Sequence, residues 1–241
     1  MRVLPIPNEF DNVYDEDANY AYALEVYRIK PEFMVDPIGV ASAYSVAVRS
    51  SCGWRRVALL DAVTGTTAVF VQLFRVPMPF DPAVANAALN ANAAVVRFFH
   101  RISYFQRTFL SPLPYDPARR NPDPDAAMRA AIRELDVSFS TPQSVVLIDR
   151  FGVAPNALPS LILAKQTFFI PRVTQGFQWQ LVAAGMEMTG EANQLVQIWT
   201  LPEANRLMTT MRSMTQSLQY RQRVLPLLTS EQQELFEPRA R

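Results

Sequence analysis

The sequence predicts an α+β fold made of two tandem copies of one strand–helix–strand–strand–helix unit. Residues 53–77 and 178–202 align without a gap, because Trp54 and Trp179 lie 125 positions apart and the motifs that follow keep that spacing. A sheet of this kind is covered by helices on one face, so its other face needs a partner. We therefore expect two ferredoxin-like (βαββα) units whose sheets face each other in one intramolecular α+β barrel.

The internal repeat is specific in residue type as well as in spacing. Self-similarity at the distance of one domain indicates duplication of a unit. The shared offset covers a tryptophan, a Thr-Gly turn, a glutamine and a closing proline: Trp54 and Trp179, Thr64-Gly65 and Thr189-Gly190, Gln72 and Gln197, Pro77 and Pro202. Upstream, residues 24–29 resemble residues 146–151 at an offset of 122, so Arg28 aligns with Arg150 in the repeat.

The elements of each copy follow from apolar runs and their punctuation by proline and glycine. The short turn between the second and third strands predicts an antiparallel hairpin in each copy. In the first copy we expect strands at 22–30, 54–63 and 67–76 and helices at 36–50 and 82–110. In the second copy we expect strands at 144–151, 177–188 and 193–201, an edge strand at 232–237, and helices at 158–169 and 203–223.

The copies divide the chain into two domains and a linker. Residues 1–117 form the first ferredoxin-like unit with an N-terminal extension, and residues 139–241 form the second. Residues 118–138 are a proline-rich linker followed by a short helix, because Asp125 is a good N-cap for the alanine-rich run after it.

Composition excludes several classes of function. The formal net charge is +1, which gives no basic excess for nucleic acid. Cys52 and His100 are the sole cysteine and histidine, so Cys/His metal sites and most nucleophile–histidine pairs have too few residues. No apolar run reaches the length of a membrane span or a signal peptide. We expect a soluble, cytoplasmic protein that binds neither nucleic acid nor membrane.

The second copy resembles the NIPSNAP family of the dimeric α+β barrel superfamily. The resemblance is carried by Gln178–Val182, Asn193–Trp199, Tyr220–Leu228 and the following Glu234–Pro238. It implies a pocket between the sheet and helices of a unit. Relatives across the superfamily include cofactor-independent monooxygenases, isomerases and lyases, haem enzymes such as chlorite dismutase, and proteins of unclear activity. The family often has His where Gln197 stands here.

The strand residues in the two copies supply candidate substrate-binding groups. Gln72 shares a strand face with Phe74, and Gln197 shares one with Trp199, because alternate residues point the same way. If that face looks toward the helices, each pair offers an amide for hydrogen bonding and a ring for stacking, with Trp179 nearby. The alternative is that the amides satisfy a buried backbone group.

Two arginines and one histidine are the charged candidates. Arg28 and Arg150 end the first strand of each copy and could hold a carboxylate or enolate; the alternative is a salt bridge to Glu25, Asp149 or a helix C-terminus. His100 and Tyr104 stand four apart on the predicted helix 82–110 and could form an acid–base pair. The alternative is a histidine on the helix surface. We thus predict His100, Tyr104 and Arg150 as catalytic, and Arg28 as substrate-binding.

The sequence favours a cofactor-independent enzyme that acts on a hydrophobic or aromatic small molecule in secondary metabolism, as a monooxygenase, isomerase, lyase or cyclase. One copy would keep the pocket and the other would close the barrel. The alternatives are a non-catalytic NIPSNAP-type binding or scaffold protein and a haem-dependent enzyme. The expected partners are a small-molecule substrate and further copies of the chain in a homo-oligomer, with no metal and no cofactor.

Overall fold

The computed structural model describes residues 20–62, 69–117, 145–188 and 193–238. The predicted linker with its short helix, the N-terminal extension and both Thr-Gly turns lie outside these residues. The first unit contains β1 (Tyr20–Ile29), α1 (Pro37–Cys52), β2 (Arg55–Ala62), β3 (Val69–Pro77), α2 (Pro82–Ala91), α3 (Ala93–Arg101) and β4 (Ile102–Pro112). The second contains β5 (Val145–Val153), α5 (Leu158–Ala164), a π-helical turn (Lys165–Phe169), α6 (Ile170–Phe177), β6 (Gln180–Glu187), β7 (Gln194–Leu201), α7 (Asn205–Gln216), α8 (Leu218–Arg223) and β8 (Leu228–Pro238).

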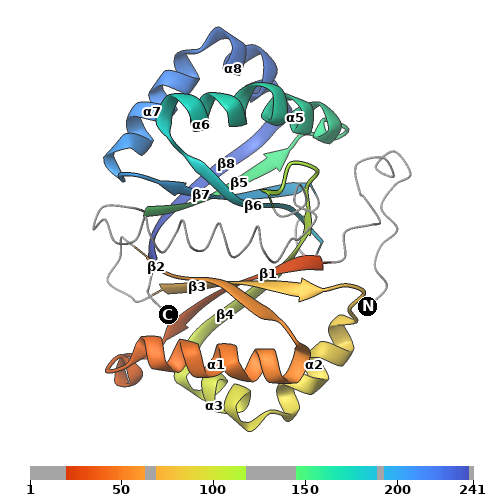
Figure 1. The fold of residues 1–241 in the computed structure, drawn as a ribbon, viewed down its shortest axis with the longest axis vertical. Coiled ribbons are helices and arrows are strands. Elements are labelled where there is room, and N and C mark those ends of the chain that lie inside the picture. Colours follow the sequence, from red (N-terminus) through yellow and green to blue (C-terminus); the bar gives the residue numbers. More distant parts are fainter. Residues whose placement is uncertain (1–19, 63–68, 118–144, 189–192, 239–241) are drawn as a thin grey trace.

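The eight strands named above close into one antiparallel barrel in the order β1-β3-β2-β8-β5-β7-β6-β4. Figure 1 shows the two sheets face to face at the centre, with α1–α3 outside one sheet and α5–α8 outside the other. Two seams join the units, where β2 pairs with β8 and β4 pairs with β6. The expected barrel of two units with their bare faces together is thereby confirmed.

The helix boundaries follow from local residue chemistry. Asp36 accepts a hydrogen bond from the Gly39 backbone N–H, and Pro37 opens α1 where no donor is needed. Gly53 ends α1 at a φ of 70°, and Gln178 ends α6 at a φ of 59°, so both helices turn into their next strand through a left-handed residue. The repeat offset of 125 therefore carries the same helix exit in both units.

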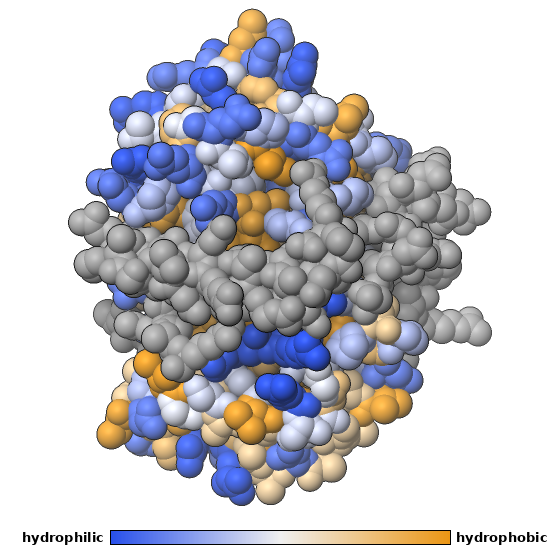
Figure 2. Space-filling view, viewed as in Figure 1, coloured by the Kyte–Doolittle hydropathy of each residue, from blue (hydrophilic) through white to orange (hydrophobic). Residues whose placement is uncertain are grey.

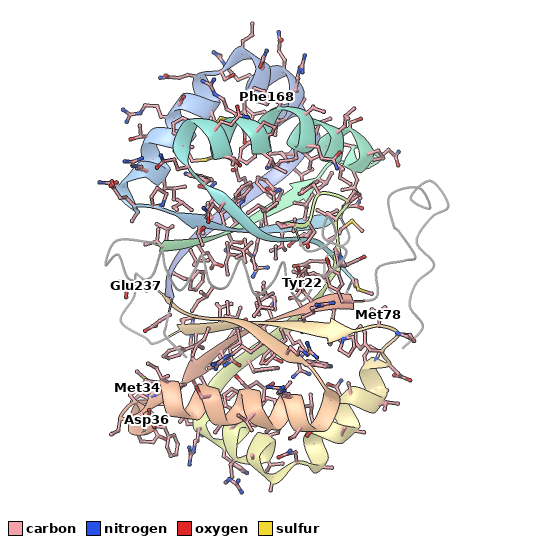
Figure 3. The ribbon with its side chains drawn as sticks, viewed as in Figure 1. Tyr22, Met34, Asp36, Met78, Phe168 and Glu237 are labelled. Atoms are coloured by element: carbon pink, nitrogen blue, oxygen red, sulfur yellow. The ribbon has the colours of Figure 1, made fainter. Side chains whose placement is uncertain are left out.

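Strand alternation divides the buried side chains into three cores. One core lies between the first sheet and α1–α3, and a second lies between the second sheet and α5–α8. The third fills the barrel between the sheets with Leu24, Leu73, Ile148 and Ile198 among others. Tyr22 points into this central layer (Figure 3). The barrel is thus packed, and it holds the two units in one body.

The segment after β4 ties the two units together. Asp116 is fully buried, and its Oδ1 accepts hydrogen bonds from the Tyr20 hydroxyl at 3.0 Å and the Tyr22 hydroxyl at 3.1 Å. Its Oδ2 accepts from the backbone N–H of Ala184 in β6 at 2.7 Å. A carboxylate from the first unit thereby joins its own β1 to a strand of the second.

Two predicted elements are wrong. The expected helix 82–110 ends at Arg101, and Ile102–Pro112 is instead strand β4, which pairs with β1 along its length. The helical part is itself divided at Asn92, whose side chain caps α3. Each unit therefore has a fourth strand, β4 or β8. The sequence predicted β8 as an edge strand at 232–237, which is wrong, because β8 spans Leu228–Pro238 and pairs with β5 on one side and β2 on the other.

The surface and the helix lengths complete the description. Figure 2 shows hydrophilic and apolar residues interspersed over both helical layers on the face it presents. None of the helices in the described ranges combines the length and apolar character that crossing a membrane requires.

Candidate functional site

Each unit places a carboxylate in the middle of its sheet, on the face toward the helices. In the first unit this carboxylate is Glu25 of β1, which lies directly opposite Gln72 of β3 on one side and Arg107 of β4 on the other, so the three form one row across the sheet. In the second unit the same row is Gln197 of β7, Asp149 of β5 and Gln233 of β8. Side chains opposite one another in neighbouring strands lie close enough to interact. The two rows are therefore equivalent positions that carry different charges.

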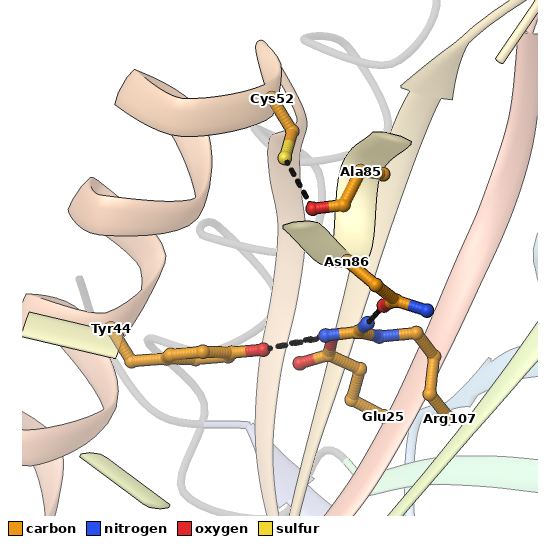
Figure 4. Close-up of polar contacts among 6 residues, drawn as sticks. All are labelled: Glu25, Tyr44, Cys52, Ala85, Asn86 and Arg107. Atoms are coloured by element: carbon orange, nitrogen blue, oxygen red, sulfur yellow. Dashed lines mark hydrogen bonds and ion pairs between the residues drawn. The ribbon is translucent and has the colours of Figure 1, made fainter. Parts of the chain in front are cut away.

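In the first unit the carboxylate is paired. Arg107 Nε lies 2.7 Å from Glu25 Oε1, the Tyr44 hydroxyl donates to the same oxygen at 3.0 Å, and Arg107 also contacts Tyr44 and Asn86 (Figure 4). Burial raises the pKa of Glu25, and the Arg107 charge opposes that rise. The cation needed by this buried acid thus comes from the neighbouring strand.

The side-chain NH₂ group of Gln72, the glutamine of the first unit, is hydrogen-bonded within the protein. Gln72 Nε2 donates to the Ala41 carbonyl oxygen at 3.1 Å and to Ser45 Oγ at 3.0 Å, both on α1. Phe74 is fully buried on the same face. Gln72 and Phe74 do face the helices, which is the condition on which their predicted role depends, and the Gln72 amide satisfies a helix carbonyl, as in the alternative interpretation.

In the second unit the cation comes from a helix. Lys165 is fully buried, and its Nζ lies 3.3 Å from the ring centre of Phe151, 3.9 Å from that of Phe169 and 3.3 Å from Gln197 Oε1. Gln197 Nε2 in turn donates to the Tyr115 hydroxyl at 3.0 Å. Lys165 opens the π-helical turn, in which the Ile170 N–H bonds back to its carbonyl; such turns are frequent at functional sites.

Asp149 stands in the same interior without a partner. It is fully buried, and neither of its carboxylate oxygens meets the geometry of a hydrogen bond in the parts of the chain that the structure describes; the amide of Gln233, opposite it on β8, is near enough to lower the pKa of Asp149 but too poorly aligned to satisfy it. The charge of Lys165 lowers the pKa of Asp149, but burial has the larger effect and raises it from 3.8 to about 8. Burial likewise lowers the pKa of Lys165 from 10.5 to about 8, against the charges of Asp149 and Glu231.

Further polar atoms of the second unit lack partners. Four buried atoms do not meet the geometry of a hydrogen bond to any described residue: Trp179 Nε1, Trp199 Nε1, Thr210 Oγ1 and the Tyr220 hydroxyl. Of these, the Tyr220 hydroxyl does lie close to Glu231, and burial together with the Glu231 charge raises the pKa of Tyr220. Buried polar groups are normally satisfied, so each exception calls for a bound molecule, a water or a function. Among the described residues the second unit has six such atoms, counting both oxygens of Asp149, and the first has three. The unmet hydrogen-bonding capacity is concentrated in one unit.

The structure brings together three of the predicted binding residues. Trp179, Gln197 and Trp199 are all fully buried in the interior of the second unit, and the rings of Trp179 and Trp199 lie 5.9 Å apart. Gln197 and Trp199 lie on the same face of β7, as strand alternation predicted, and that face looks toward the helices. Lys165 and Asp149 join them there.

The two arginines point elsewhere. Strand alternation puts Arg28 and Arg150 on the barrel side of β1 and β5, with Val26 and Ile148. Arg150 lies 3.5 Å from Glu187 and 3.9 Å from Glu234, and Arg28 lies over the ring of Tyr104 at 5.5 Å. They are not equivalent positions, because the register aligns Glu25 with Asp149 at an offset of 124, and the offset of 122 was wrong.

The proposed pairing of His100 with Tyr104 on one helix is wrong. His100 is exposed at the end of α3, whereas Tyr104 lies on β4 with 43% of its surface exposed and donates to Gln106 Oε1 at 2.6 Å. A helix-surface histidine is what the structure has. Arg150, the third predicted catalytic residue, belongs to the other unit.

Sequence reasoning missed the two central residues. Lys165 is one of two lysines, and it falls on the buried stripe formed by Leu158, Leu161, Ile162 and Phe169. A lysine at helical spacing within an apolar stripe was the available signal. Asp149 gave a similar signal, as an acid on the helix-facing side of a strand that is otherwise apolar on that face. Within the described residues no group of three His, Cys, Asp or Glu side chains is arranged to hold a metal.

Comparison with solved structures identifies the fold. A candidate monooxygenase of Fusobacterium nucleatum is 8% identical, covers 92% of this chain and 93% of its own, and has a TM-score of 0.52. A chlorite dismutase of Candidatus Nitrospira defluvii is 7% identical, with 91% and 92% covered and a TM-score of 0.51. A NIPSNAP-like domain protein of Burkholderia xenovorans is 16% identical over 41% of this chain and 87% of its own, with a TM-score of 0.35.

The chain therefore has the dimeric α+β barrel fold, with both units in one polypeptide. No family model and no curated protein matches the sequence. Fold alone does not fix a reaction.

Proposed function

We propose that the chain is a cofactor-independent enzyme that transfers protons on a hydrophobic or aromatic small molecule inside its second unit. The carrying observation is that Asp149 and Lys165 are both fully buried in one interior without forming an ion pair, while neither Asp149 oxygen meets the geometry of a hydrogen bond to a described residue. Two buried ionisable groups that do not satisfy each other suit a molecule that bonds to both.

The two groups can exchange roles as acid and base. With pKa values of about 8 each, protonated Asp149 can donate and neutral Lys165 can accept a proton near neutral pH. Gln197 lies beside Lys165 and can orient a substrate oxygen through its amide. The rings of Phe151, Phe169 and Trp199 supply the apolar walls that an aromatic substrate needs. This arrangement supports an isomerase or lyase type of reaction more than any other.

The first unit has the supporting role in this proposal. Its acid is already paired with Arg107 and its glutamine is bonded to α1, so its interior offers fewer free polar atoms. It closes the barrel and positions Tyr115, which reaches Gln197 from the segment after β4.

The described residues do not fit a haem, the cofactor implied by the haem enzymes of this superfamily. His100 is the sole imidazole, and it lies exposed on α3 in the first unit. In the second unit the buried cation is Lys165, whose Nζ lies between the rings of Phe151 and Phe169, and no histidine is available there to bind a haem iron.

The test is exchange of α-protons in D₂O, followed by proton NMR with acetophenone, phenylpyruvate and aliphatic ketones as probes. We expect catalysed exchange by the wild-type chain and a loss of about 10²–10⁴-fold in Lys165→Met and Asp149→Asn. Equal exchange rates in wild type and both variants would rule out this site.

The repeat provides a matched pair of variants. Gln197→Leu and Gln72→Leu make the same change at equivalent positions, and circular dichroism would confirm that both fold. We expect only Gln197→Leu to slow exchange. The opposite result would move the site to the first unit. Saturable binding of a ketone without exchange would instead favour a non-catalytic binding protein.

A further inference from the structure

We propose that Lys165 is a nucleophile that forms an imine with an aldehyde or ketone substrate. This inference rests on the proposed function, because it names the substrate class and the covalent step of the same site. It starts from the surroundings of the Lys165 nitrogen and from the unpartnered carboxyl of Asp149.

Lys165 Nζ has fewer hydrogen-bond acceptors around it than an ammonium group can use. An ammonium group carries three donors, yet Gln197 Oε1 is the one acceptor that bonds to Nζ among the described residues. The remaining contacts are the faces of Phe151 and Phe169. The rings attract a cation, but burial outweighs that attraction and the pKa falls to about 8. About half of the amine is then neutral at pH 8, with a lone pair available for attack.

Asp149 supplies the proton that imine formation requires. The Lys165 nitrogen attacks the carbonyl carbon, and one amine proton passes to the carbonyl oxygen to give a carbinolamine. The Asp149 carboxyl, whose pKa is raised by burial, then protonates the hydroxyl group. The C–O bond breaks, water leaves, and the nitrogen lone pair forms the C=N bond. The products are one water, one iminium that keeps the second amine proton, and the Asp149 carboxylate.

Imine formation also gives the Asp149 carboxylate a partner that it lacks among the described residues when no substrate is bound. A buried carboxylate without partners is unfavourable, but the iminium and the Asp149 carboxylate form an ion pair in the same interior. The iminium draws electrons from the adjacent carbon, and the carboxylate is then the base that takes the α-proton. Proton exchange, isomerisation and cleavage of a bond next to the carbonyl all proceed from this arrangement.

The first unit cannot perform the same step. Arg107 holds the equivalent charge there, and a guanidinium stays protonated and is no nucleophile. The nucleophile is therefore a property of the second unit, where the cation comes from α5 and its π-helical turn.

The chain is well suited to a direct test, since Lys30 and Lys165 are its only lysines. The full-length protein is incubated at pH 7.5 with benzaldehyde and sodium cyanoborohydride, and the benzyl group is located by peptide mass spectrometry. We expect labelling of Lys165 to exceed that of Lys30 by about tenfold or more, because burial lowers the pKa of Lys165 and so leaves more of its amine neutral at this pH. Lys30→Arg should leave labelling of Lys165 unchanged, and Lys165→Arg should abolish labelling at that position.

Asp149→Asn separates the acid from the nucleophile. This variant keeps the amine and has a side chain of nearly the same shape, so we expect Lys165 to be labelled about 10²-fold more slowly. Formaldehyde under the same conditions measures access to the amine alone. Methylation of Lys165 without benzyl labelling, or labelling of Lys165 no faster than Lys30, would overturn the imine proposal.

The failure of this inference is distinguishable from failure of the proposed function. Exchange of α-protons that depends on Lys165 and Asp149, without any trapped adduct, would leave direct enolisation as the mechanism. Absence of both exchange and adduct would reject both.

Discussion

Glu25 and Asp149 hold the same place in the two units, each in register opposite a buried glutamine. Glu25 reaches Arg107 on the strand beside it, whereas Asp149 has Gln233 at that position and contacts no cation in the described structure. The counter-charge of the second unit moves to Lys165, on the helical side. The first unit thus contains a buried ion pair, whereas the second contains a buried acid and a buried amine that are not paired with each other.

The pair in the first unit predicts a large loss of stability on truncation. Arg107→Met leaves Glu25 buried without its cation, and we expect the free energy of unfolding to fall by roughly 3–5 kcal/mol. Chemical denaturation followed by circular dichroism measures it. The double variant Glu25→Gln/Arg107→Met removes both charges and should recover most of the loss. A single variant as stable as wild type would mean that Arg107 contributes nothing to this core.

Asp149 predicts a gain of stability when its charge is removed. Its pKa is about 8 in the folded chain and 3.8 unfolded, so the folded state binds the extra proton and loses stability as the pH rises from about 4 to 8. Asp149→Asn avoids that loss. Each unit of pKa difference corresponds to about 1.4 kcal/mol, so we expect a gain of several kcal/mol at pH 8.

The same variant should gain little near pH 4, where the carboxyl is protonated in both states. Urea titrations of wild type and Asp149→Asn at the two pH values provide the comparison. A difference that does not change with pH would show that Asp149 is charged in the folded protein throughout.

Lys165 predicts an unusual titration that can be observed directly. Lysine labelled with carbon-13 at Cε gives two NMR signals in this chain, and Lys30→Arg assigns them. We expect the Lys165 signal to titrate near pH 8, and lower in Asp149→Asn, because the Asp149 charge raises the pKa of Lys165. A midpoint at or above 10 would contradict the desolvated environment.

This depressed pKa also has a consequence for stability. The unfolded chain binds the lysine proton up to about pH 10.5, so the folded state loses stability as the pH falls from about 10.5 to 8. Lys165→Met should remove that dependence, which the same urea titrations would detect.

Two glycines offer a matched test of the barrel seam. A Cβ added to Gly185 would lie 2.7 Å from Leu110 Cβ and 3.1 Å from the Ser111 carbonyl oxygen, where β6 meets β4. We expect Gly185→Ala to destabilise the protein by about 1–3 kcal/mol through overpacking. Gly176 on α6 has nothing within 4 Å, so Gly176→Ala should be neutral or stabilising by up to about 1 kcal/mol. Thermal unfolding of both variants checks the contrast.

The repeat and the sheet faces could be predicted from the sequence because they depend on local periodicity. Trp54 and Trp179 share an offset, and alternation put Gln72 with Phe74 and Gln197 with Trp199 on one strand face each, although alternation alone does not show which layer that face looks toward. Residues 102–112 could not be assigned in this way. No proline or glycine separates them from the helix before, and their conformation is determined by pairing with β1, a tertiary interaction that overrides local preference.

The site was harder to predict for a related reason. Asp149 and Lys165 each broke an apolar pattern, but nothing local shows that a strand and a π-helical turn bring them into one interior. Tyr115 is more remote still, since it follows β4 of the other unit. For residues that come together only through tertiary packing, the sequence shows which of them break the apolar pattern, but it does not show which of them lie near each other.

Joining both halves in a single polypeptide releases them from two-fold symmetry. In a homodimer every substitution appears twice and must suit both subunits, so a buried lysine in one interior forces a buried lysine in the other. Here β2–β8 and β4–β6 are heterologous junctions between different sequences, and each half is free to diverge. The first unit can therefore keep the stabilising Glu25–Arg107 ion pair, while the second can carry the unpaired Asp149 and Lys165 of the proposed site.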